Sequence, residues 1–251
     1  MNAEDKSITR SIPKIDPSKG TRYAISDIHG CAQTFKALIK KINLSSDDQL
    51  FLLGDYINKG PDSKGVLDYI IELQKSYSVF CLRGNHEELL MRAHRRAGGD
   101  KSIRLIPILH RGRGLVDENR RILPQYLPFL ESLSYYFELE DYYLVHAGFD
   151  FEAPDPFSET EKMLWVRYFE VDTSIVGEKR IIHGHVPEYL QFIQEEIDYG
   201  CPSICIDNGC VYKTRRKAGL GRLLALNLDT LEIILQENIE TERSSSRSHF
   251  L

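Results

Sequence analysis

One pattern occurs three times in the N-terminal part of the chain: an apolar run, a short polar motif and then a segment with helical spacing. The apolar runs are TRYAIS, QLFLL and YSVFCL, at 21–26, 49–53 and 77–82. Strands that alternate with helices form mainly parallel sheets, and such sheets bind ligands at the carboxyl ends of their strands. The repeat therefore predicts an α/β fold whose polar motifs gather at one edge of a sheet.

The segments that follow these motifs have apolar residues three and four positions apart. They lie at 34–42, 63–76 and 88–97, and the first places Phe35, Leu38 and Ile42 on one face. This spacing predicts an amphipathic helix after each strand.

Beyond residue 97 the rhythm changes. We expect a helical insertion, broken by glycines and prolines, at about 88–132, and a hairpin at 134–150. Further apolar runs predict strands within 180–189, 203–212 and 221–235, the last with a turn at its NLDT. The predicted organisation is an extended arm at 1–20, one domain at 21–236 that includes the insertion, and a polar, disordered tail at 237–251.

Composition limits the classes of partner. The net charge of −5 gives no overall basic character, so neither nucleic acid nor an anionic membrane surface is an expected partner. No apolar run reaches the ~18 residues of a membrane span. The five cysteines include no CxxC pair and the N-terminal segment lacks an apolar block, so we predict a cytoplasmic protein. The sequence leaves the oligomeric state open.

The polar residues at the predicted strand ends combine carboxylate, amide and imidazole groups without a thiolate. They are Asp27, His29, Asp55, Asn85, His86, His146, His183 and His185. Mixed oxygen and nitrogen ligands suit Mn²⁺, Fe or Zn²⁺ better than a closed structural zinc site. These separate clusters, each directly after an apolar run, predict a metal centre.

The motifs SDIHG, GDYINKG, LRGNHE, VHAG and HGHVP, in this order, resemble those of the calcineurin-like metallophosphoesterases. More narrowly, the chain resembles bacterial members of the serine/threonine phosphoprotein phosphatase branch, from about residue 23 to about residue 235. The segment GDYINKGPDS also resembles that of symmetrical diadenosine-tetraphosphate hydrolases. The resemblance implies a β-sandwich of two mixed sheets flanked by helices.

The resemblance also implies two divalent metal ions, with Mn expected and Fe or Zn as alternatives. The implied ligands are Asp27 and His29 for the first ion, Asp55 as the bridge, and Asn85, His146 and His185 for the second. It implies His86 as the general acid beside the leaving oxygen. It further implies that Arg167, Lys59 and Asn85 contact phosphate oxygens.

Two positions depart from the pattern of this family. Where Asn58 stands, the family commonly has an Asp that orients and charges the catalytic imidazole, here His86. Asn58 can still accept a hydrogen bond from His86, but it supplies no charge to raise its pKa. Lys59 replaces the planar fork of an arginine with a point charge. Neither departure removes an implied metal ligand, so we predict an active enzyme. The sequence leaves open whether Asn58 contacts His86.

The role of His183 has two readings. It precedes His185 by two residues, so both side chains point to the same face of a strand. Some wider relatives use both histidines of such a pair as ligands. We expect His183 to support the site without touching a metal ion, and a direct ligand is the alternative.

Three functions fit these residues. The leading prediction is a phosphomonoesterase that acts on phosphoserine or phosphothreonine in proteins, or on small phosphoesters. In this reaction a metal-bound hydroxide would attack phosphorus, with His86 as the general acid. The alternative is a symmetrical dinucleoside-polyphosphate hydrolase, favoured by 54–63 and disfavoured by Glu87, where that group usually has Asp. A phosphate-binding pseudophosphatase is the third, and the complete set of ligands counts against it.

Overall fold

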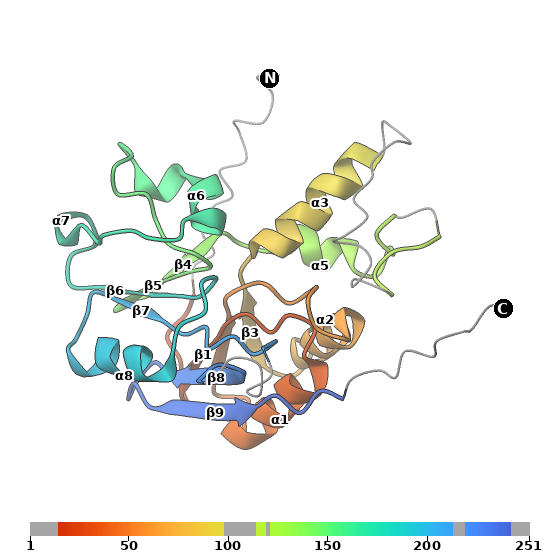
Figure 1. Ribbon diagram of the computed structural model, residues 1–251, viewed down its shortest axis with the longest axis horizontal. Coiled ribbons are helices and arrows are strands. Elements are labelled where there is room, and N and C mark those ends of the chain that lie inside the picture. The colour runs from red at the N-terminus through yellow and green to blue at the C-terminus, as the bar shows by residue number, and fades with distance from the viewer. Residues whose placement is uncertain (1–14, 98–113, 119–120, 213–218, 242–251) are drawn as a thin grey trace.

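The computed structural model of the protein describes residues 15–97, 114–118, 121–212 and 219–241. Two mixed sheets form its centre (Figure 1). The first contains, in spatial order, β3 (Ser78–Cys81), β2 (Gln49–Leu52), β1 (Arg22–Ile25), β8 (Arg222–Asn227) and β9 (Ile233–Glu237). The second contains β4 (Tyr136–Glu138), β5 (Tyr142–Val145), β6 (Arg180–His183) and β7 (Ser203–Cys205). The predicted pair of mixed sheets flanked by helices is confirmed.

The apolar run Leu50 to Leu53, which contains most of strand β2, is buried on both of its faces. Leu50 and Leu52 pack in the core beneath the helices, whereas Phe51 and Leu53 face the core shared with the second sheet. All four side chains are fully buried. A strand buried on both faces reads as a continuous apolar run, because both sets of alternating side chains avoid water.

The outer face of the first sheet is covered by α1 (Ala32–Ile42) and α2 (Ser63–Leu73), which lie away from β4–β7 in Figure 1. The α2 helix begins at Asp62, whose side chain accepts a hydrogen bond from the N–H of Gly65 at 2.9 Å. The α1 helix ends at Asn43, whose backbone is left-handed with φ of 51°. The start of α2 and the end of α1 are therefore each formed by a capping residue.

The second sheet is covered by short elements that the sequence did not reveal. They are the 3₁₀-helix η1 (Pro156–Ser158), α6 (Thr160–Trp165), α7 (Thr173–Val176) and α8 (Leu190–Asp198). Met163 of α6 and Val176 of α7 pack against the outward-facing Tyr143 and Val145 of β5. Ile193 of α8 joins the core between the sheets.

The helical insertion is only partly visible. α3 (Asn85–Ala97) leads into it and α5 (Leu127–Ser132) closes it, with an isolated bridge between Val116 and Ile122. α3 begins three residues before the segment expected from the spacing. Pro128 lies in the first turn of α5, where proline needs no hydrogen-bond partner. Residues 98–113 and 119–120 lie outside the described residues.

The predicted arm and tail are shorter than expected. Ile15 packs against the core between the sheets, and the carbonyl of Asp16 accepts a hydrogen bond from Gln49 at 2.7 Å. After β9, the carboxylate of buried Glu240 accepts hydrogen bonds from the N–H and hydroxyl of Thr34. The boundary placed at residue 237 therefore falls too early, because side chains as far as residue 240 bond to the domain. Residues 1–14 and 242–251 lie outside the described part.

Strand 203–212 is also shorter than predicted, since β7 ends at Cys205 and a loop follows. The turn predicted at NLDT is present, with the Asn227 side chain accepting a hydrogen bond from the N–H of Asp229 at 2.9 Å. Among the helices of the described residues, none has the length and apolar character to cross a membrane.

Candidate metal centre

The polar motifs come together where the carboxyl ends of the two sheets meet. In the first sheet, β1 leads to Asp27 and β2 leads to Asp55. In the second sheet, β5 leads to His146 and β6 leads to His185. The ligand atoms of Asp55, His146 and His185 lie within 4.8 Å of one another. The polar motifs therefore converge from both sheets, whereas the sequence predicted that they gather at the edge of one sheet.

The backbone at these residues is unusual. Asp27, His29, Asp55 and His185 all have left-handed backbone, with φ of 48°, 47°, 55° and 74°. Positive φ is uncommon for residues with a side chain, although Asp, Asn and His tolerate it best. Such conformations cluster at functional sites, where the surrounding structure holds them in place.

Two glycines of the motifs allow the loops to approach one another. A Cβ on Gly84 would lie 2.2 Å from the Asp55 Oδ1, and a Cβ on Gly184 would lie 1.8 Å from the Ser26 hydroxyl. No other residue fits at these positions, because any side chain would overlap the neighbouring motif. The glycines in LRGNHE and HGHVP thus set the spacing of the site.

Asp55 stands between two groups of ligand atoms. Its Oδ2 lies 3.4 Å from His29 Nε2, and its Oδ1 lies 3.6 Å from His146 Nε2. One group contains His29, Asp55 and His86, and the other contains Asp55, His146 and His185. The carboxylate therefore presents one oxygen to each group.

Hydrogen bonds fix the orientation of two imidazoles. His29 Nδ1 lies 3.2 Å from the carbonyl of Ile57, and His146 Nδ1 lies 2.9 Å from the carbonyl of Leu53. A carbonyl oxygen only accepts, so each Nδ1 carries the proton and each Nε2 keeps its lone pair. Both lone pairs point toward Asp55, the arrangement in which histidines bind metal ions.

Several buried acceptors in this site have no donor. Asp27 Oδ1 is buried without a hydrogen-bond partner and lies 3.6 Å from His29 Nε2. The Asn85 Oδ1 faces acceptors only, with His146 Nε2 at 3.2 Å and both oxygens of Asp55 nearby, and the reversed amide would instead donate hydrogen bonds to these atoms. A cation among these converging buried acceptors would satisfy them, including Asp27 Oδ1, which has no other partner. The residues present therefore fit divalent metal ions.

The buried carboxylates differ in their titration. Burial, and then the charge of Asp27, raise the pKa of Asp55 well above its usual value. Burial acts in the same direction on Asp27, but the charges of His146 and His29 and a hydrogen bond from the His185 N–H lower its pKa. Two carboxylates so close together are unfavourable as a pair of anions unless a cation lies between them.

A family model described as calcineurin-like phosphoesterase matches residues 21–215, which contain every candidate ligand. The chain belongs to this family. The family predicted from the motifs is thereby confirmed, and these phosphoesterases bind divalent metal ions.

Two curated relatives carry the name bis(5'-nucleosyl)-tetraphosphatase, symmetrical. The protein from Nitrosomonas europaea is 31% identical over 177 residues, which cover 66% of this chain and 59% of that protein. The protein from Cellvibrio japonicus is 33% identical over 132 residues, covering 50% of this chain and 44% of that protein. The phosphoesterase thus spans about half the length of these relatives.

Two solved structures share the fold. A putative diadenosine tetraphosphatase has a TM-score of 0.61 at 19% identity, with 88% of this chain and 95% of that chain covered. A protein serine/threonine phosphatase from Saccharomyces cerevisiae has a TM-score of 0.53 at 16% identity, with 88% and 81% covered. At these identities the likeness concerns the fold alone.

Asn58 contacts His86, and the hydrogen bond runs opposite to the direction considered from the sequence. The Asn58 Nδ2 donates to His86 Nδ1 at 3.0 Å, and the Asn58 Oδ1 is buried without a partner. His86 in this phosphoesterase therefore accepts at Nδ1 and carries its proton on Nε2, which lies 3.9 Å from Asp55 Oδ2. Burial, and then the charge of Lys59, lower the pKa of His86 to about 4.

The two residues predicted to contact phosphate, Lys59 and Arg167, differ in their surroundings. Lys59 Nζ lies 2.6 Å from His29 Nε2. Arg167 is exposed on the segment after α6. Burial, followed by the charge of His146, lowers the pKa of His185 to about 4, and the charge of Arg167 adds to this effect. The charge of the exposed Arg167 thus reaches His185, a member of the second group.

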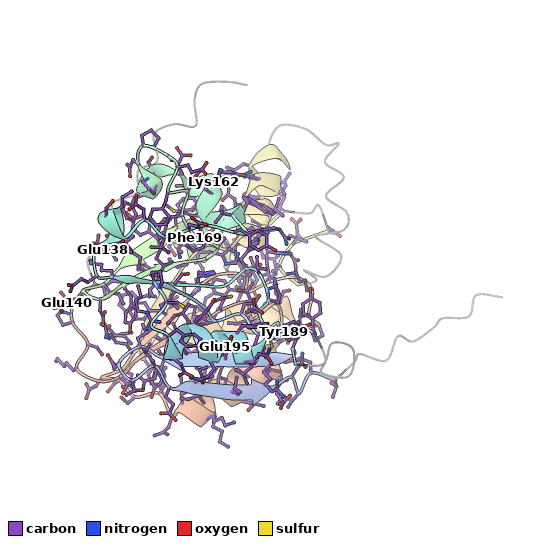
Figure 2. All side chains as sticks on the ribbon, turned by 60° about the vertical axis from the view of Figure 1, so that its left-hand side comes forward. Glu138, Glu140, Lys162, Phe169, Tyr189 and Glu195 are labelled. Atoms are coloured by element: carbon purple, nitrogen blue, oxygen red, sulfur yellow. The ribbon has the colours of Figure 1, made fainter. Side chains whose placement is uncertain are left out.

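His183 belongs to neither group of ligand atoms among the described residues. Its Nδ1 lies 3.3 Å from the carbonyl of Gly184. The ring of Phe169, labelled in Figure 2 on the segment after α6, packs edge-on against it at 5.2 Å. These contacts favour a supporting role for His183.

Two further buried acids, Asp207 and Glu87, lie in the phosphoesterase site, and neither was predicted from the sequence as a site residue. Asp207 follows β7, and burial together with the charge of Asp27 raises its pKa well above the usual value. Glu87 accepts hydrogen bonds from the backbone N–H groups of Asp55, Tyr56, Ile57 and Gly84. The signal for Asp207 was available, since it follows an apolar run in the same way as Asp27 and Asp55.

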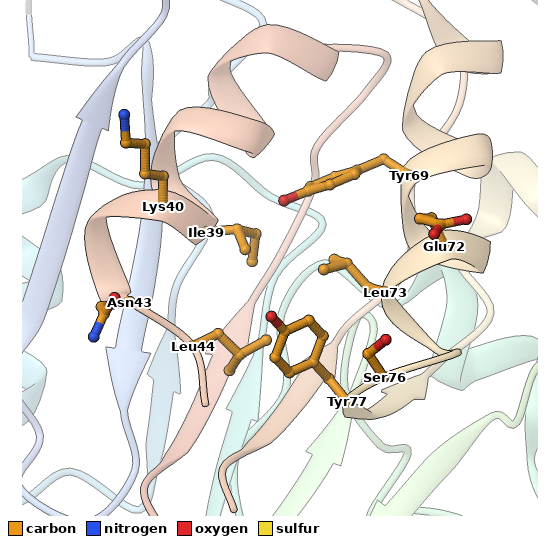
Figure 3. A pocket seen from close by; sticks show the side chains of 9 residues that line it. All are labelled: Ile39, Lys40, Asn43, Leu44, Tyr69, Glu72, Leu73, Ser76 and Tyr77. Carbon is orange, nitrogen blue, oxygen red and sulfur yellow. The ribbon is translucent and has the colours of Figure 1, made fainter. Parts of the chain in front are cut away.

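A pocket of about 380 Å³ lies elsewhere, between the C-terminal ends of α1 and α2 (Figure 3). Tyr69, Leu73 and Tyr77 form one side, and Ile39 and Leu44 form the other. Both helices begin beside the metal centre and end at this pocket, and none of the candidate ligands lines it. We assign it no part in the chemistry.

Proposed function

We propose that the protein is a phosphoesterase that uses two divalent metal ions bridged by Asp55. The observation that carries this proposal is the position of Asp55, whose two oxygens face two separate groups of ligand atoms. Asp27 and His29 would hold the first ion together with Asp55. The second ion would be held by Asp55 with Asn85, His146 and His185. Mn²⁺ is the ion we propose, and Fe and Zn²⁺ suit the same donor set.

The chain's own residues would position the substrate and supply a proton. Two metal ions, when bound, provide positive charge and an activated water for displacement at phosphorus. Lys59 and Arg167 would hold phosphate oxygens. His86 would give a proton from Nε2 to the leaving oxygen while its ring is protonated on both nitrogens. In that form Nδ1 also donates, so the Asn58 amide that contacts it would turn its oxygen toward the ring.

For the substrate, we propose a dinucleoside tetraphosphate that is cleaved symmetrically. The support comes from the curated relatives of that name in Nitrosomonas europaea and Cellvibrio japonicus, together with the resemblance of 54–63. The sequence alone favoured a phosphoprotein phosphatase. The comparisons support the alternative better, because the relatives reported above match this chain at 31% and 33% identity.

Phosphoprotein hydrolysis is the second candidate, and Glu87 favours it. The LRGNHE motif carries Glu after the histidine, as in the phosphatase branch that the sequence resembles. The length of the Glu87 side chain lets its two oxygens reach the amides of Tyr56 and Gly84 at 2.9 and 3.0 Å. An Asp at this position would be one methylene shorter.

Product analysis separates these functions. With Mn²⁺ present, diadenosine tetraphosphate should give two molecules of ADP, identified by ion-exchange chromatography, and a phosphoserine peptide should release little phosphate. Faster hydrolysis of the peptide would instead favour the phosphatase. A protein that binds Mn²⁺ but turns over neither substrate nor an aryl phosphate would be the pseudophosphatase. The His86→Ala variant serves as the control for contaminating hydrolases.

A further inference from the structure

Lys59 contacts a candidate metal ligand, which a residue that only binds phosphate would not do. It lies in the loop between β2 and α2 with left-handed backbone, φ 59°, and its ammonium is 2.6 Å from His29 Nε2. The Nδ1 of the same imidazole bonds to the Ile57 carbonyl. The Nε2 lone pair of His29 is therefore the acceptor of a hydrogen bond from Lys59, because an ammonium group can only donate.

The surroundings of this contact are anionic. His29 Nε2 lies 3.6 Å from Asp27 Oδ1 and 3.4 Å from Asp55 Oδ2, and both carboxylates are almost completely buried. The Lys59 ammonium thus lies among the donors proposed for the first metal ion. A buried carboxylate is stable as an anion only with a positive partner, and the ammonium provides one.

We infer that Lys59 and the first metal ion compete for the Nε2 lone pair of His29. One lone pair cannot serve both, and the like charges of an ammonium and a divalent cation repel at such distances. Binding of the metal ion then releases Lys59 toward the substrate side, where its ammonium can hold a phosphate oxygen. This inference rests on the metal site of the proposed function and not on the choice of substrate.

The difference between lysine and arginine gives this exchange a physical basis. The lysine ammonium is a compact point charge on a flexible stem, so it can cover a single lone pair and also swing away. The planar guanidinium of arginine is suited to paired oxygens instead. The departure from the family pattern at position 59 therefore changes the metal site as well as the phosphate contact.

The affinity for metal tests the inference directly. Full-length protein is treated with a chelator and titrated with Mn²⁺, with free Mn²⁺ followed by electron paramagnetic resonance. The Lys59→Met variant, which keeps a side chain of similar length, should bind the first Mn²⁺ about 10–100-fold more tightly, because the metal ion no longer has to displace a charge-assisted hydrogen bond. Lys64→Met is the matched control and should bind as the wild type does, since Lys64 pairs with Asp68 at the surface.

Stability without metal gives an independent readout. The thermal midpoint of chelator-treated Lys59→Met should fall below that of the wild type, since Asp27 and Asp55 lose their internal cation. The midpoints with saturating Mn²⁺ should be alike. Lys59→Gln, which keeps a donor without the charge, should show the same two effects and serves if Lys59→Met does not fold.

The opposite result is equally specific. If Lys59→Met and Lys59→Gln bind Mn²⁺ no more tightly than the wild type, while inorganic phosphate inhibits them more weakly, Lys59 is a phosphate contact only and the inference is wrong. A wild-type protein that binds no Mn²⁺ would remove the proposed metal function itself.

Discussion

At the scale of single residues, Asp55 connects the two halves of the site. Its oxygens face His29 and His146, and Oδ1 also accepts a hydrogen bond from the backbone N–H of His86 at 3.0 Å. The Asp55 backbone N–H donates to Glu87. A change at this residue therefore alters both groups of ligand atoms together.

The Asp55→Asn variant should lose more activity than a variant of any ligand that serves one ion. Asparagine keeps the shape but removes the charge shared by the two ions, so both should bind more weakly. Metal content per chain and turnover of an aryl phosphate measure the effect. Asp68→Asn, at the surface of α2, is the control and should behave as the wild type. Two bound ions with normal turnover in Asp55→Asn would refute the bridging role.

His183 and His185 should respond differently to truncation. His185→Ala should remove the second ion, because His185 shares a ligand group with Asp55 and His146. His183→Ala should lower metal affinity or activity by about 10–100-fold, as is typical for groups that only support ligands. Metal titration of both variants decides between the two roles. Equal loss of metal in the two would show that His183 is itself a ligand.

The Asn58→Asp variant should change the pH dependence of turnover. Burial and the charge of Lys59 lower the pKa of His86 to about 4, and Asn58 brings no opposing charge. A carboxylate in contact with His86 Nδ1 would stabilise the imidazolium and raise its pKa. A general acid acts only while protonated, so the alkaline limb of the kcat profile should move to higher pH.

Leaving groups provide the control for this experiment. An alkyl phosphate needs a proton on its leaving oxygen and should respond more than an aryl phosphate, with a gain below the ~10²–10⁴-fold typical of general acid catalysis. If KM rises while the profile stays in place, the new carboxylate repels the substrate and does not act through His86.

At the scale of elements, the first turn of α3 organises the neighbouring loop. Glu87 lies in this turn and is fully buried. Its Oε1 accepts from the N–H groups of Tyr56 and Ile57, and its Oε2 accepts from those of Asp55 and Gly84. The helix thereby holds the backbone that carries the bridging carboxylate.

The Glu87→Gln variant should lower both stability and metal affinity. Glutamine offers one oxygen in place of two, and its NH₂ would face two backbone donors. A buried donor left unsatisfied typically costs about 1–3 kcal/mol. Urea unfolding and Mn²⁺ titration measure the two effects, with Glu131→Gln on α5 as an exposed control. Unchanged stability and affinity would mean that Glu87 does not hold the loop.

The elements that the sequence predicted are those with a strong period. The strands β1 to β3 and the helices after them were predicted because apolar runs and helical spacing alternate over long segments. The helices α6 and α7 contain six and four residues, too few for a period of 3.6 to be recognised. Their positions follow from packing against β5, which is a tertiary effect.

The candidate site was predictable for a related reason. Strand ends meet at a sheet edge, so Asp27, Asp55 and His146 could be grouped before their distances were known. The direction of the hydrogen bond between Asn58 and His86 could not be predicted from the sequence, because it depends on the orientation of the Asn58 side-chain amide. The contact of Lys59 with His29 depends on side-chain conformation in the same way.

At the scale of the whole molecule, the site joins the two sheets. His146, after β5, donates from Nδ1 to the carbonyl of Leu53, after β2, at 2.9 Å. The backbone N–H of His185, after β6, donates to Asp27 Oδ2, after β1, at 2.9 Å. Metal ions held between these residues would add bonds across the same junction, where buried acids of both sheets converge.

Removal of metal should therefore lower the stability of the entire domain. A ligand that binds only the folded state stabilises it by RT ln(1 + [L]/Kd), about 2.7 kcal/mol at a hundredfold excess over Kd. For a chain of this size, ~1 kcal/mol corresponds to about 2–4 °C, so chelation should lower the thermal midpoint by roughly 5–11 °C. Added Mn²⁺ should restore the midpoint in the wild type and in Asp68→Asn, but much less in Asp55→Asn. If complete removal of metal leaves the midpoint unchanged, the ions do not link the two sheets, and the hydrogen bonds between their loops hold this junction by themselves.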